Sequence, residues 1–389
     1  MSLHLQILTI VFVTAVVMGA VVNKTNFCTM GAVSDWVNMG DKGRLRAWFL
    51  AMAVAMGGLV FMEGSGIFTY PQDPSQVFPP YRTTGFAWGR YIVGGFLFGI
   101  GMTLGSGCGN KTLIRVGAGN LKSVIVLIVA SIVAYIMLHT NFFGLYMLPW
   151  ISATTIDLAK YGIQGQDIGS LVKASPLLKL FIGEAIALVL LWFVFKSADF
   201  RSSFDNILGG VVVGVAVIIG WYITGSAMGA AWMEEAMFSE LPPTRVAVQS
   251  YTFISPMGDT ARYLMNPSHS EFINFGVMAL TGVIVGSFLY AIISKKFRIE
   301  WFVNGKDAAN HIVGGALMGF GGVLGMGCTV GQGITGVSTL ALGSFLVLIS
   351  IIFGSALTMK VQFNMLDEQS FFQALRTSLA EMKLLPKAA

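Results

Sequence analysis

Charged residues are scarce in this chain. Asp, Glu, Lys and Arg make up 11% of its 389 residues, whereas hydrophobic residues make up 55% and the mean hydropathy is +0.73. This balance lies far from that of a soluble domain and is typical of an integral membrane protein surrounded by lipid. The net charge of +5 does not point to nucleic acid, because in a membrane protein the side that carries the positive charge matters more than the sum.

Cysteine is also rare. The three cysteines form no CxxC pair and no zinc-ribbon spacing, which argues against a disulfide framework and a structural zinc site. We expect no cofactor, no metal and no catalytic residue. Glycine, in contrast, occurs 47 times and falls inside apolar segments, where it favours close helix packing over a flexible linker.

Apolar runs of about 20 residues, the length that crosses a bilayer, predict an all-α membrane protein. The first run has no basic leader and no A-x-A cleavage site, so we expect a retained helix rather than a signal peptide. The nine predicted spans cover residues 3–22, 45–68, 86–105, 121–140, 177–195, 206–225, 272–294, 309–326 and 339–359.

Lys and Arg predict the orientation of these spans, because basic residues collect in cytoplasmic loops. With the N-terminus in the periplasm and the C-terminus in the cytoplasm, the short inner loops hold most of them. These are Lys24, Lys42, Arg44, Arg46, Lys111, Arg115, Lys122, Lys196, Arg201, Lys295, Lys296, Arg298 and Lys306, and the tail adds Arg376, Lys383 and Lys387.

An internal repeat links the third and eighth spans. A shift of 220 positions aligns the segment that ends at Cys108 with the segment that ends at Cys328, and eleven of the seventeen residues from Ile92 to Cys108 are identical. Because the copies are five spans apart, they cross in opposite directions, which predicts two inverted repeats around a central pathway. A weaker echo pairs NFCTMG at 26–31 with TFISPMG at 252–258.

The repeat divides the single transmembrane domain of residues 1–389. The first half covers 1–142, a linker with a connecting helix covers 143–204, and the second half covers 205–360. Residues 361–389 form the predicted cytoplasmic tail, in which Phe371, Leu375, Leu379 and Met382 recur at helical spacing and indicate an amphipathic helix on the lipid surface. The outer stretch 226–271 is interpreted as a lid or vestibule, or as an inert loop.

All three cysteines lie in glycine-rich breaks of the helical pattern: Cys28 in NKTNFCTMG, Cys108 in GSGCGNK and Cys328 in GMGCTVGQG. Broken backbone at membrane depth is tolerated where it is buried in protein or lines a cavity, so we expect short re-entrant helices beside the pathway. Cys108 and Cys328 then stand near helix N-termini, where free N–H groups favour an anion. A single buried cysteine is usually a small hydrophobe, but three in such breaks indicate function.

The predicted substrate-binding residues are the cysteines and their neighbours. Neutral side chains there supply hydrogen bonds to an anion, although capping of helix ends explains them equally well. Lys111 and Arg115 can attract an anion, but topology alone also accounts for them. The predicted binding residues are Cys28, Cys108, Cys328, Gly107, Gly109, Asn110, Gly327, Thr329 and Gln332, with Asn26 and Thr112 as further donors.

Three ionisable residues within the apolar runs are candidates for proton coupling, because they are costly there without a partner: Glu63, Glu184 and His311. Glu63 and His311 fall near the ends of predicted spans, where a side chain reaches water easily. Glu184 is the deep candidate.

The segments NFCTMGAVSDW, IVGGFLFGIGMTLGSGCGNKTLIR and VGGALMGFGGVLGMGCTVGQGITG closely resemble the YeeE/YedE family of bacterial inner-membrane proteins. The resemblance implies an hourglass of helices and uptake of thiosulfate, with some members handling related sulfur or selenium species. It also implies a relay of the anion by S–H···S contacts along Cys28, Cys108 and Cys328, and a cytoplasmic partner such as a TusA-like or rhodanese-like sulfur carrier.

Two rival functions belong to other classes. One is a membrane thiol enzyme or persulfide carrier with a covalently modified cysteine, which the absence of a CxxC pair and of a placed general base disfavours. The other is a permease for a soft metal, which the lack of His or Met clusters beside the cysteines disfavours. Transport of a small sulfur-containing anion without covalent chemistry is the preferred interpretation.

Overall fold

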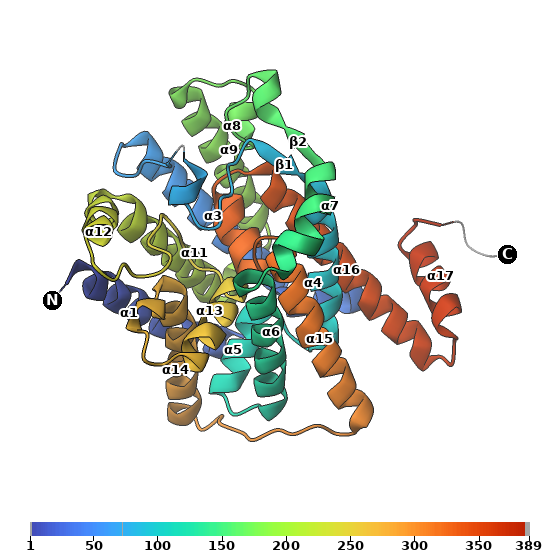
Figure 1. The fold of residues 1–389 in the computed structure, drawn as a ribbon. Coiled ribbons are helices and arrows are strands. Elements are labelled where there is room, and N and C mark those ends of the chain that lie inside the picture. Colours follow the sequence, from blue (N-terminus) through green and yellow to red (C-terminus); the bar gives the residue numbers. More distant parts are fainter. Residues whose placement is uncertain (1, 72, 386–389) are drawn as a thin grey trace.

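The computed structural model describes residues 2–71 and 73–385, so Met1 and the last four residues of the predicted tail, Lys387 among them, lie outside it. Long helices dominate the chain (Figure 1), and all nine predicted apolar runs are helical. They are α1 (Leu3–Thr25), α3 (Gly43–Gly64), α4 (Trp88–Leu104), α6 (Leu121–His139), α9 (Pro176–Phe195), α11 (Phe204–Gly225), α14 (Phe275–Ile293), α15 (Gly305–Leu324) and α16 (Leu342–Leu366).

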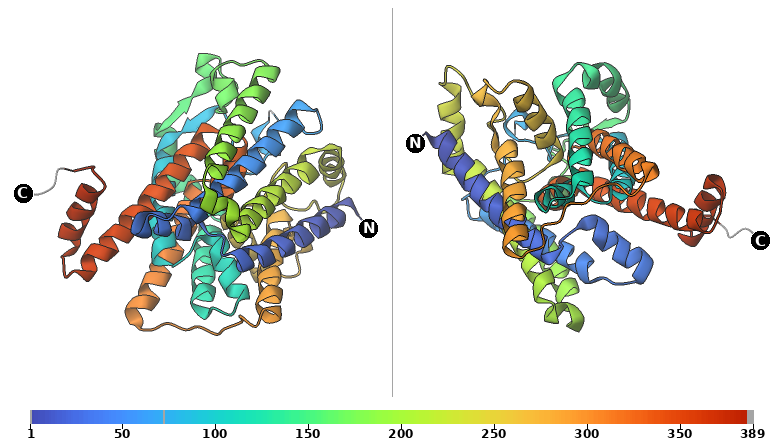
Figure 2. Two further views of the ribbon diagram at one scale, coloured as in Figure 1. Left: turned by 180° about the vertical axis from the view of Figure 1, so that it is seen from behind. Right: turned by 90° about the horizontal axis from the view of Figure 1, so that it is seen from below.

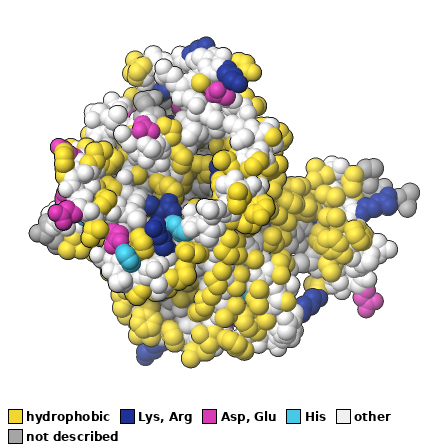
Figure 3. Space-filling model, viewed as in Figure 1, with side chains coloured by type: hydrophobic (Ala, Val, Ile, Leu, Met, Phe, Trp, Pro, Cys, Tyr) yellow, Lys and Arg dark blue, Asp and Glu magenta, His cyan; other side chains and the backbone are white. Residues whose placement is uncertain are grey.

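Eight segments of the described chain are long and apolar enough to cross a membrane. They include every long helix except α15, whose first turns carry Lys306, Asp307 and His311 and are too polar to qualify. The all-α membrane fold is therefore confirmed, whereas the count of nine spans stays a prediction. Hydrophobic side chains cover most of the face in Figure 3 and charged ones are sparse there, as expected of a surface that faces lipid.

Short helices and turns fill the breaks between the long helices. The short helices are α2 (Thr29–Ser34), α5 (Gly109–Gly117), α7 (Leu148–Ala153), α8 (Ile168–Leu171), α10 (Ala198–Ser202), α12 (Ala227–Met237), α13 (Ile254–Met265) and α17 (Phe371–Glu381). Single turns of other helix types are η1 (Asp35–Met39), η2 (Pro74–Gln76), η3 (Phe143–Met147), η4 (Leu158–Tyr161), η5 (Ser270–Phe272) and η6 (Gly331–Gly336). The strands β1 (Gly85–Ala87) and β2 (Thr155–Asp157) pair antiparallel, with Phe86 opposite Ile156.

Local sequence explains where several helices begin. Asn120, Asn274 and Asn304 each stand directly before a helix, and each side-chain oxygen accepts a backbone N–H three residues later. Ser175 does the same for α9, where Pro176 occupies the first helical position. These caps satisfy N–H groups that have no partner within the helix.

Glycines bring α4 and α15 into backbone contact. A Cβ added to Gly94 would stand 2.4 Å from the nitrogen of Gly325, and one added to Gly314 would stand 2.4 Å from the nitrogen of Gly105. Side chains are excluded from such a crossing, and small residues make it possible. A shift of 220 positions turns one contact into the other, as the predicted inverted repeat requires, although the equivalence of the two halves remains a prediction.

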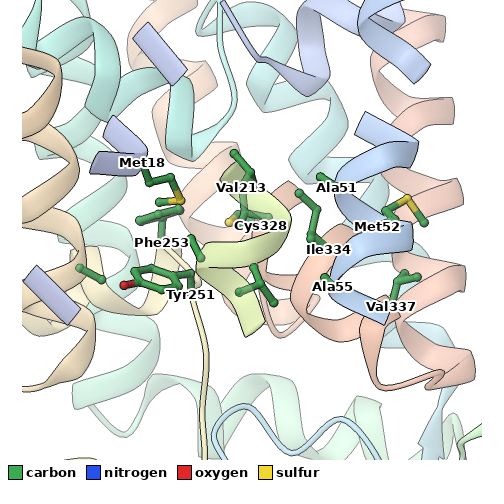
Figure 4. Packing of buried hydrophobic residues seen from close by; sticks show 14 of the residues in the cluster. Met18, Ala51, Met52, Ala55, Val213, Tyr251, Phe253, Cys328, Ile334 and Val337 are labelled. Carbon is green, nitrogen blue, oxygen red and sulfur yellow. The ribbon is translucent and has the colours of Figure 1, made fainter. Parts of the chain in front are cut away.

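Other helix contacts also come in pairs that the predicted inverted repeat relates to each other. α4 also packs against α16 and α15 against α6, while α1 packs against α14 and α3 against α11. α9 packs against α3 at the edge of the bundle. The buried core, part of which Figure 4 shows, therefore draws on helices from both ends of the chain.

The tail contains a helix, α17 (Phe371–Glu381). α17 turns back along the end of α16, and the pair stands away from the rest of the bundle (Figures 1 and 2). Leu375, Leu379 and Met382 pack against a small cluster that contains Leu357 and Val361. Phe371 is half exposed, so part of the apolar face of α17 stays free to meet lipid.

Candidate functional site

Two identical turns place Cys108 and Cys328. At the end of α4 the N–H of Gly107 donates to the carbonyl of Met102 at 2.8 Å, and at the end of α15 the N–H of Gly327 donates to Gly322 at 2.7 Å. Both turns form the Schellman motif, which requires one residue in the left-handed region. Ser106 and Met326 occupy that position, with φ of 57° and 62°. The repeated sequence thus ends both helices with the same turn, and a cysteine follows each turn.

Each cysteine begins a helical segment. Cys28 is the N-cap of α2 and Cys108 is the N-cap of α5, while Cys328 directly precedes the helical residues 329–338. The sulfur of Cys28 accepts the N–H of Gly31 at 3.4 Å, and the sulfur of Cys328 accepts the N–H of Gly331 at 3.3 Å. The thiols therefore lie at the positive ends of short helices, as the sequence indicates.

The three cysteines are buried and lie near one another in space. All three are at least 94% buried, and the side chains of Cys28 and Cys108 interact with each other. Beyond Cys108, a Cβ on Gly109 would stand 3.8 Å from the Cβ of Cys328, and Thr329 contacts the Cys108 side chain. No three His, Cys, Asp or Glu side chains in the described chain are arranged to hold a metal ion.

Cys328 lies deep in the core. Figure 4 shows its side chain among Val213, Phe253 and Ile334, and it is fully buried. Phe253 comes from the outer stretch 226–271, which the sequence interpretation placed outside the site. The structure differs, because residues 250–253 enter the core and α13 starts directly after them.

Four buried polar atoms near the cysteines have no hydrogen-bond partner among the described residues. Asn110, Thr252, Thr329 and Gln332 are each at least 95% buried. The atoms without a partner are Asn110 Oδ1, Thr252 Oγ1, Thr329 Oγ1 and Gln332 Oε1. An unsatisfied buried polar group costs about 1–3 kcal/mol, so such a cluster indicates a place where something else supplies the bonds.

Thr252 is the functional candidate that the sequence interpretation missed. Its side chain contacts Cys328, and its hydroxyl oxygen would stand 2.3 Å from a Cβ on Gly331. The weak echo between 26–31 and 252–258 was the available signal, since it pairs the Cys28 segment with the segment of Thr252. Without a cysteine in the second copy, however, nothing singled out the threonine.

The remaining predicted site residues have structural contacts. The Nε2 of Gln332 donates to the carbonyl of Gly325 at 2.7 Å and ties the Cys328 segment to the preceding turn. A Cβ on Gly107 would stand 3.3 Å from the Lys111 side chain, and one on Gly327 would stand 3.2 Å from Gln332. Gly107 and Gly327 thus serve close packing of each turn against the next helix. Thr112 is buried in α5.

The three ionisable candidates lie apart from the cysteines. Glu63 forms a two-pronged ion pair with Arg82, at 2.6 and 3.0 Å, and His311 contacts Asp307 in the first turns of α15. Glu184 stands at the α3–α9 interface, where its carboxylate would lie 3.5 Å from a Cβ on Gly57. Glu63 and His311 therefore have partners that explain their presence.

Comparison with known proteins identifies relatives along nearly the whole chain. The family model described as "Sulphur transport" matches residues 24–357. A protein of Escherichia coli K12 named thiosulfate transporter TsuA is 22% identical over 362 residues, which cover 87% of this chain and 89% of that protein. A protein of the same name from Spirochaeta thermophila is 24% identical over 352 residues, covering 87% and 93%. The matched region contains all three cysteines and both repeated turns.

Proposed function

Because the chain belongs to the sulphur-transport family, we propose that it carries thiosulfate or a related small sulfur-containing anion across the bacterial inner membrane along Cys28, Cys108 and Cys328. The observation that supports this proposal is the proximity of three buried cysteines from three breaks far apart in the sequence, which we interpret as a row. Packing alone gives no reason to place every cysteine of the chain beside another broken helix.

The hydrogen-bond donors of the row suit a soft anion that has to be bound weakly enough to be released. Thiols and backbone N–H groups at helix ends are neutral donors, so each contact is weaker than an ion pair would be. The hydroxyls of Thr252 and Thr329 have no other partner in the described chain and can donate to the oxygen atoms of the anion. Several weak sites in sequence let an ion enter and leave, which conduction requires.

The predicted orientation gives the order of the cysteines across the membrane, and the family resemblance implies uptake. With a periplasmic N-terminus, α1 and α4 run inward, so Cys28 and Cys108 lie on the inner side of the row and Cys328 on the outer side. We therefore place the anion first at Cys328, then at Cys108, then at Cys28. A TusA-like or rhodanese-like carrier that receives the sulfur in the cytoplasm is part of the proposal and rests on the family resemblance alone.

Uptake into proteoliposomes tests the substrate. Purified full-length protein in sealed vesicles should accumulate labelled thiosulfate faster than vesicles without protein. Unlabelled thiosulfate should compete strongly, and sulfate, which has no terminal sulfur to meet the thiols, should compete weakly. Equal competition by sulfate would contradict recognition of the terminal sulfur, and uptake no faster than in empty vesicles would contradict thiosulfate transport.

A further inference from the structure

Three basic side chains surround the inner end of the cysteine row. Lys111 follows Cys108 in the first turn of α5, and its Nζ donates to Oδ1 of Asn26 at 3.1 Å. Arg115 lies one turn further along α5, and Arg44 extends from the start of α3. A Cβ on Gly31, in the helix that Cys28 caps, would collide with the Arg44 guanidinium. Lys111 interacts electrostatically with Cys28, Cys108 and both arginines.

The negative charge near these side chains does not match the positive charge. Arg44 forms an ion pair with the buried carboxylate of Asp35. Arg115 donates to the backbone carbonyl of Ser106 at 2.5 Å, and Lys111 donates to a neutral amide. Among the described residues, then, Asp35 is the sole carboxylate that forms an ion pair with any of the three. Neighbouring like charges repel one another, and a bound anion would relieve that repulsion.

The charge is confined to one end of the row. A shift of 220 positions takes Lys111 to Gly331 and Arg115 to Thr335, and both of these are neutral. A requirement for basic residues in inner loops explains why Lys and Arg occur on one side of the membrane. It does not explain why they gather around the thiols, since basic residues elsewhere in those loops satisfy it equally.

The cluster is open to water. Asn26 is exposed, and Lys111, Arg44 and Arg115 are each partly exposed, whereas the thiols beside them are buried. An anion at the basic side chains can therefore exchange with solvent and still lie next to Cys28 and Cys108. Hydrogen bonds from charged donors to oxygen are stronger than those from the neutral donors along the row. An oxyanion is therefore expected to bind most strongly at the three basic side chains.

We propose that Lys111, Arg115 and Arg44 form an inner anion-binding site that holds the negatively charged oxygen atoms of the substrate as its terminal sulfur leaves the thiols. This site rests on the proposed function and adds to it a resting position at the inner end of the row. Lys111 is its central member, because it alone of the three has neither a carboxylate nor a helix-end carbonyl as partner among the described residues.

Calorimetric titration of the detergent-purified full-length protein with thiosulfate tests the site. Replacement Lys111→Gln removes the charge and keeps a polar side chain, and it should weaken thiosulfate binding at least about tenfold, because a charged hydrogen bond is lost. Lys111→Arg should restore binding to within about threefold of the wild type, since the charge returns. Lys196→Gln, at the end of α9, removes a charge on the same predicted side and should leave the affinity unchanged.

Gel filtration keeps a folding defect separate from a binding defect, and the arginine variant shows that the position accepts a change. Wild-type affinity in Lys111→Gln would overturn the inner site, and so would an equal loss in Lys196→Gln, which would mean that total charge alone is sensed. If the wild-type protein itself neither binds nor accumulates thiosulfate, the proposed function fails and the inner site fails with it.

Discussion

The side chain of Cys28 interacts with that of Cys108, although one residue caps α2 and the other caps α5. This interaction brings the two breaks together. Cys108 also interacts with Thr329, the residue next to Cys328. Functional changes are therefore expected to be largest at Cys108 and its direct neighbours.

Replacement of Thr329 should reduce transport without reducing stability. Its hydroxyl is fully buried and has no hydrogen-bond partner in the described chain, so Thr329→Val removes an unsatisfied group without changing side-chain volume. We expect a melting temperature equal to or above that of the wild type, together with uptake reduced roughly fivefold or more, about 1 kcal/mol of lost interaction with the anion. Thermal denaturation and vesicle uptake of the same preparation measure both.

The matched control is Thr358→Val on α16, whose hydroxyl donates to the carbonyl of Gly354 within its own helix. This change should leave uptake unaltered. A clear fall in the melting temperature of Thr329→Val would mean that the hydroxyl is satisfied inside the protein and is not free for a substrate.

A methyl group added at the glycine contact between α4 and α15 should destabilise the protein. Gly94→Ala and Gly314→Ala each place a Cβ 2.4 Å from backbone nitrogen, so the helices must separate, at a cost of about 1–3 kcal/mol for overpacking. Gly305→Ala, where nothing lies within 4 Å of the added atom, is the control. Both crossing variants should melt lower than the control in the same detergent. Equal melting of all three would refute the close contact of α4 with α15.

Asp259 should make stability depend on acid pH. Burial of this carboxylate opposes its ionisation, but hydrogen bonds and charge from His139 and Arg245 outweigh burial and hold the pKa of Asp259 below its usual value. A lowered folded-state pKa stabilises the protein above the ordinary Asp pKa of about 4, and that stabilisation is lost as the pH falls through the folded value.

The variant Asp259→Asn tests this dependence. It should melt below the wild type at neutral pH, because Arg245 and His139 lose their charged partner. The difference should shrink as the pH falls below the ordinary Asp pKa of about 4 toward the lowered folded-state value, because the wild-type carboxylate then becomes protonated as well. A difference that stays constant with pH would show that the loss comes from packing.

The termini should lie on opposite sides of the membrane. Nine spans with the N-terminus in the periplasm require a cytoplasmic C-terminus, and the basic inner loops favour that orientation. A reporter that is active in the periplasm should work at the N-terminus and fail at the C-terminus. The same side for both ends would show that α15, the polar helix among the nine, does not span.

The two turns that precede Cys108 and Cys328 could be predicted because the sequence repeats them. The identical turns before Cys108 and Cys328 follow from matching residues, and local hydrogen bonds close them. The ion pair of Arg82 with Glu63 could not be predicted from the sequence, because it depends on how the loop between α3 and α4 folds back. The contact of Thr252 with Cys328 could not be predicted either, because it arises from packing between distant segments.

Lys111 shows a different limit. The sequence analysis offered attraction of an anion as one reason for this lysine, but a predicted inner loop alone also explained it, as it explains Lys122. In the structure Lys122 forms a 2.8 Å ion pair with Asp307, whereas Lys111 lies beside two thiols and bonds to a neutral amide. A partner in space, which the sequence does not show, distinguishes the two lysines.

The most direct test of the cysteine row is uptake of labelled thiosulfate by proteoliposomes that contain the variant Cys28→Ala, Cys108→Ala, Cys328→Ala. Because each thiol is a contact along the row, we expect uptake to fall to that of vesicles without protein, while Cys108→Ala alone reduces it by at least about tenfold. Uptake by the correctly folded triple variant at a rate close to the wild type would contradict the account.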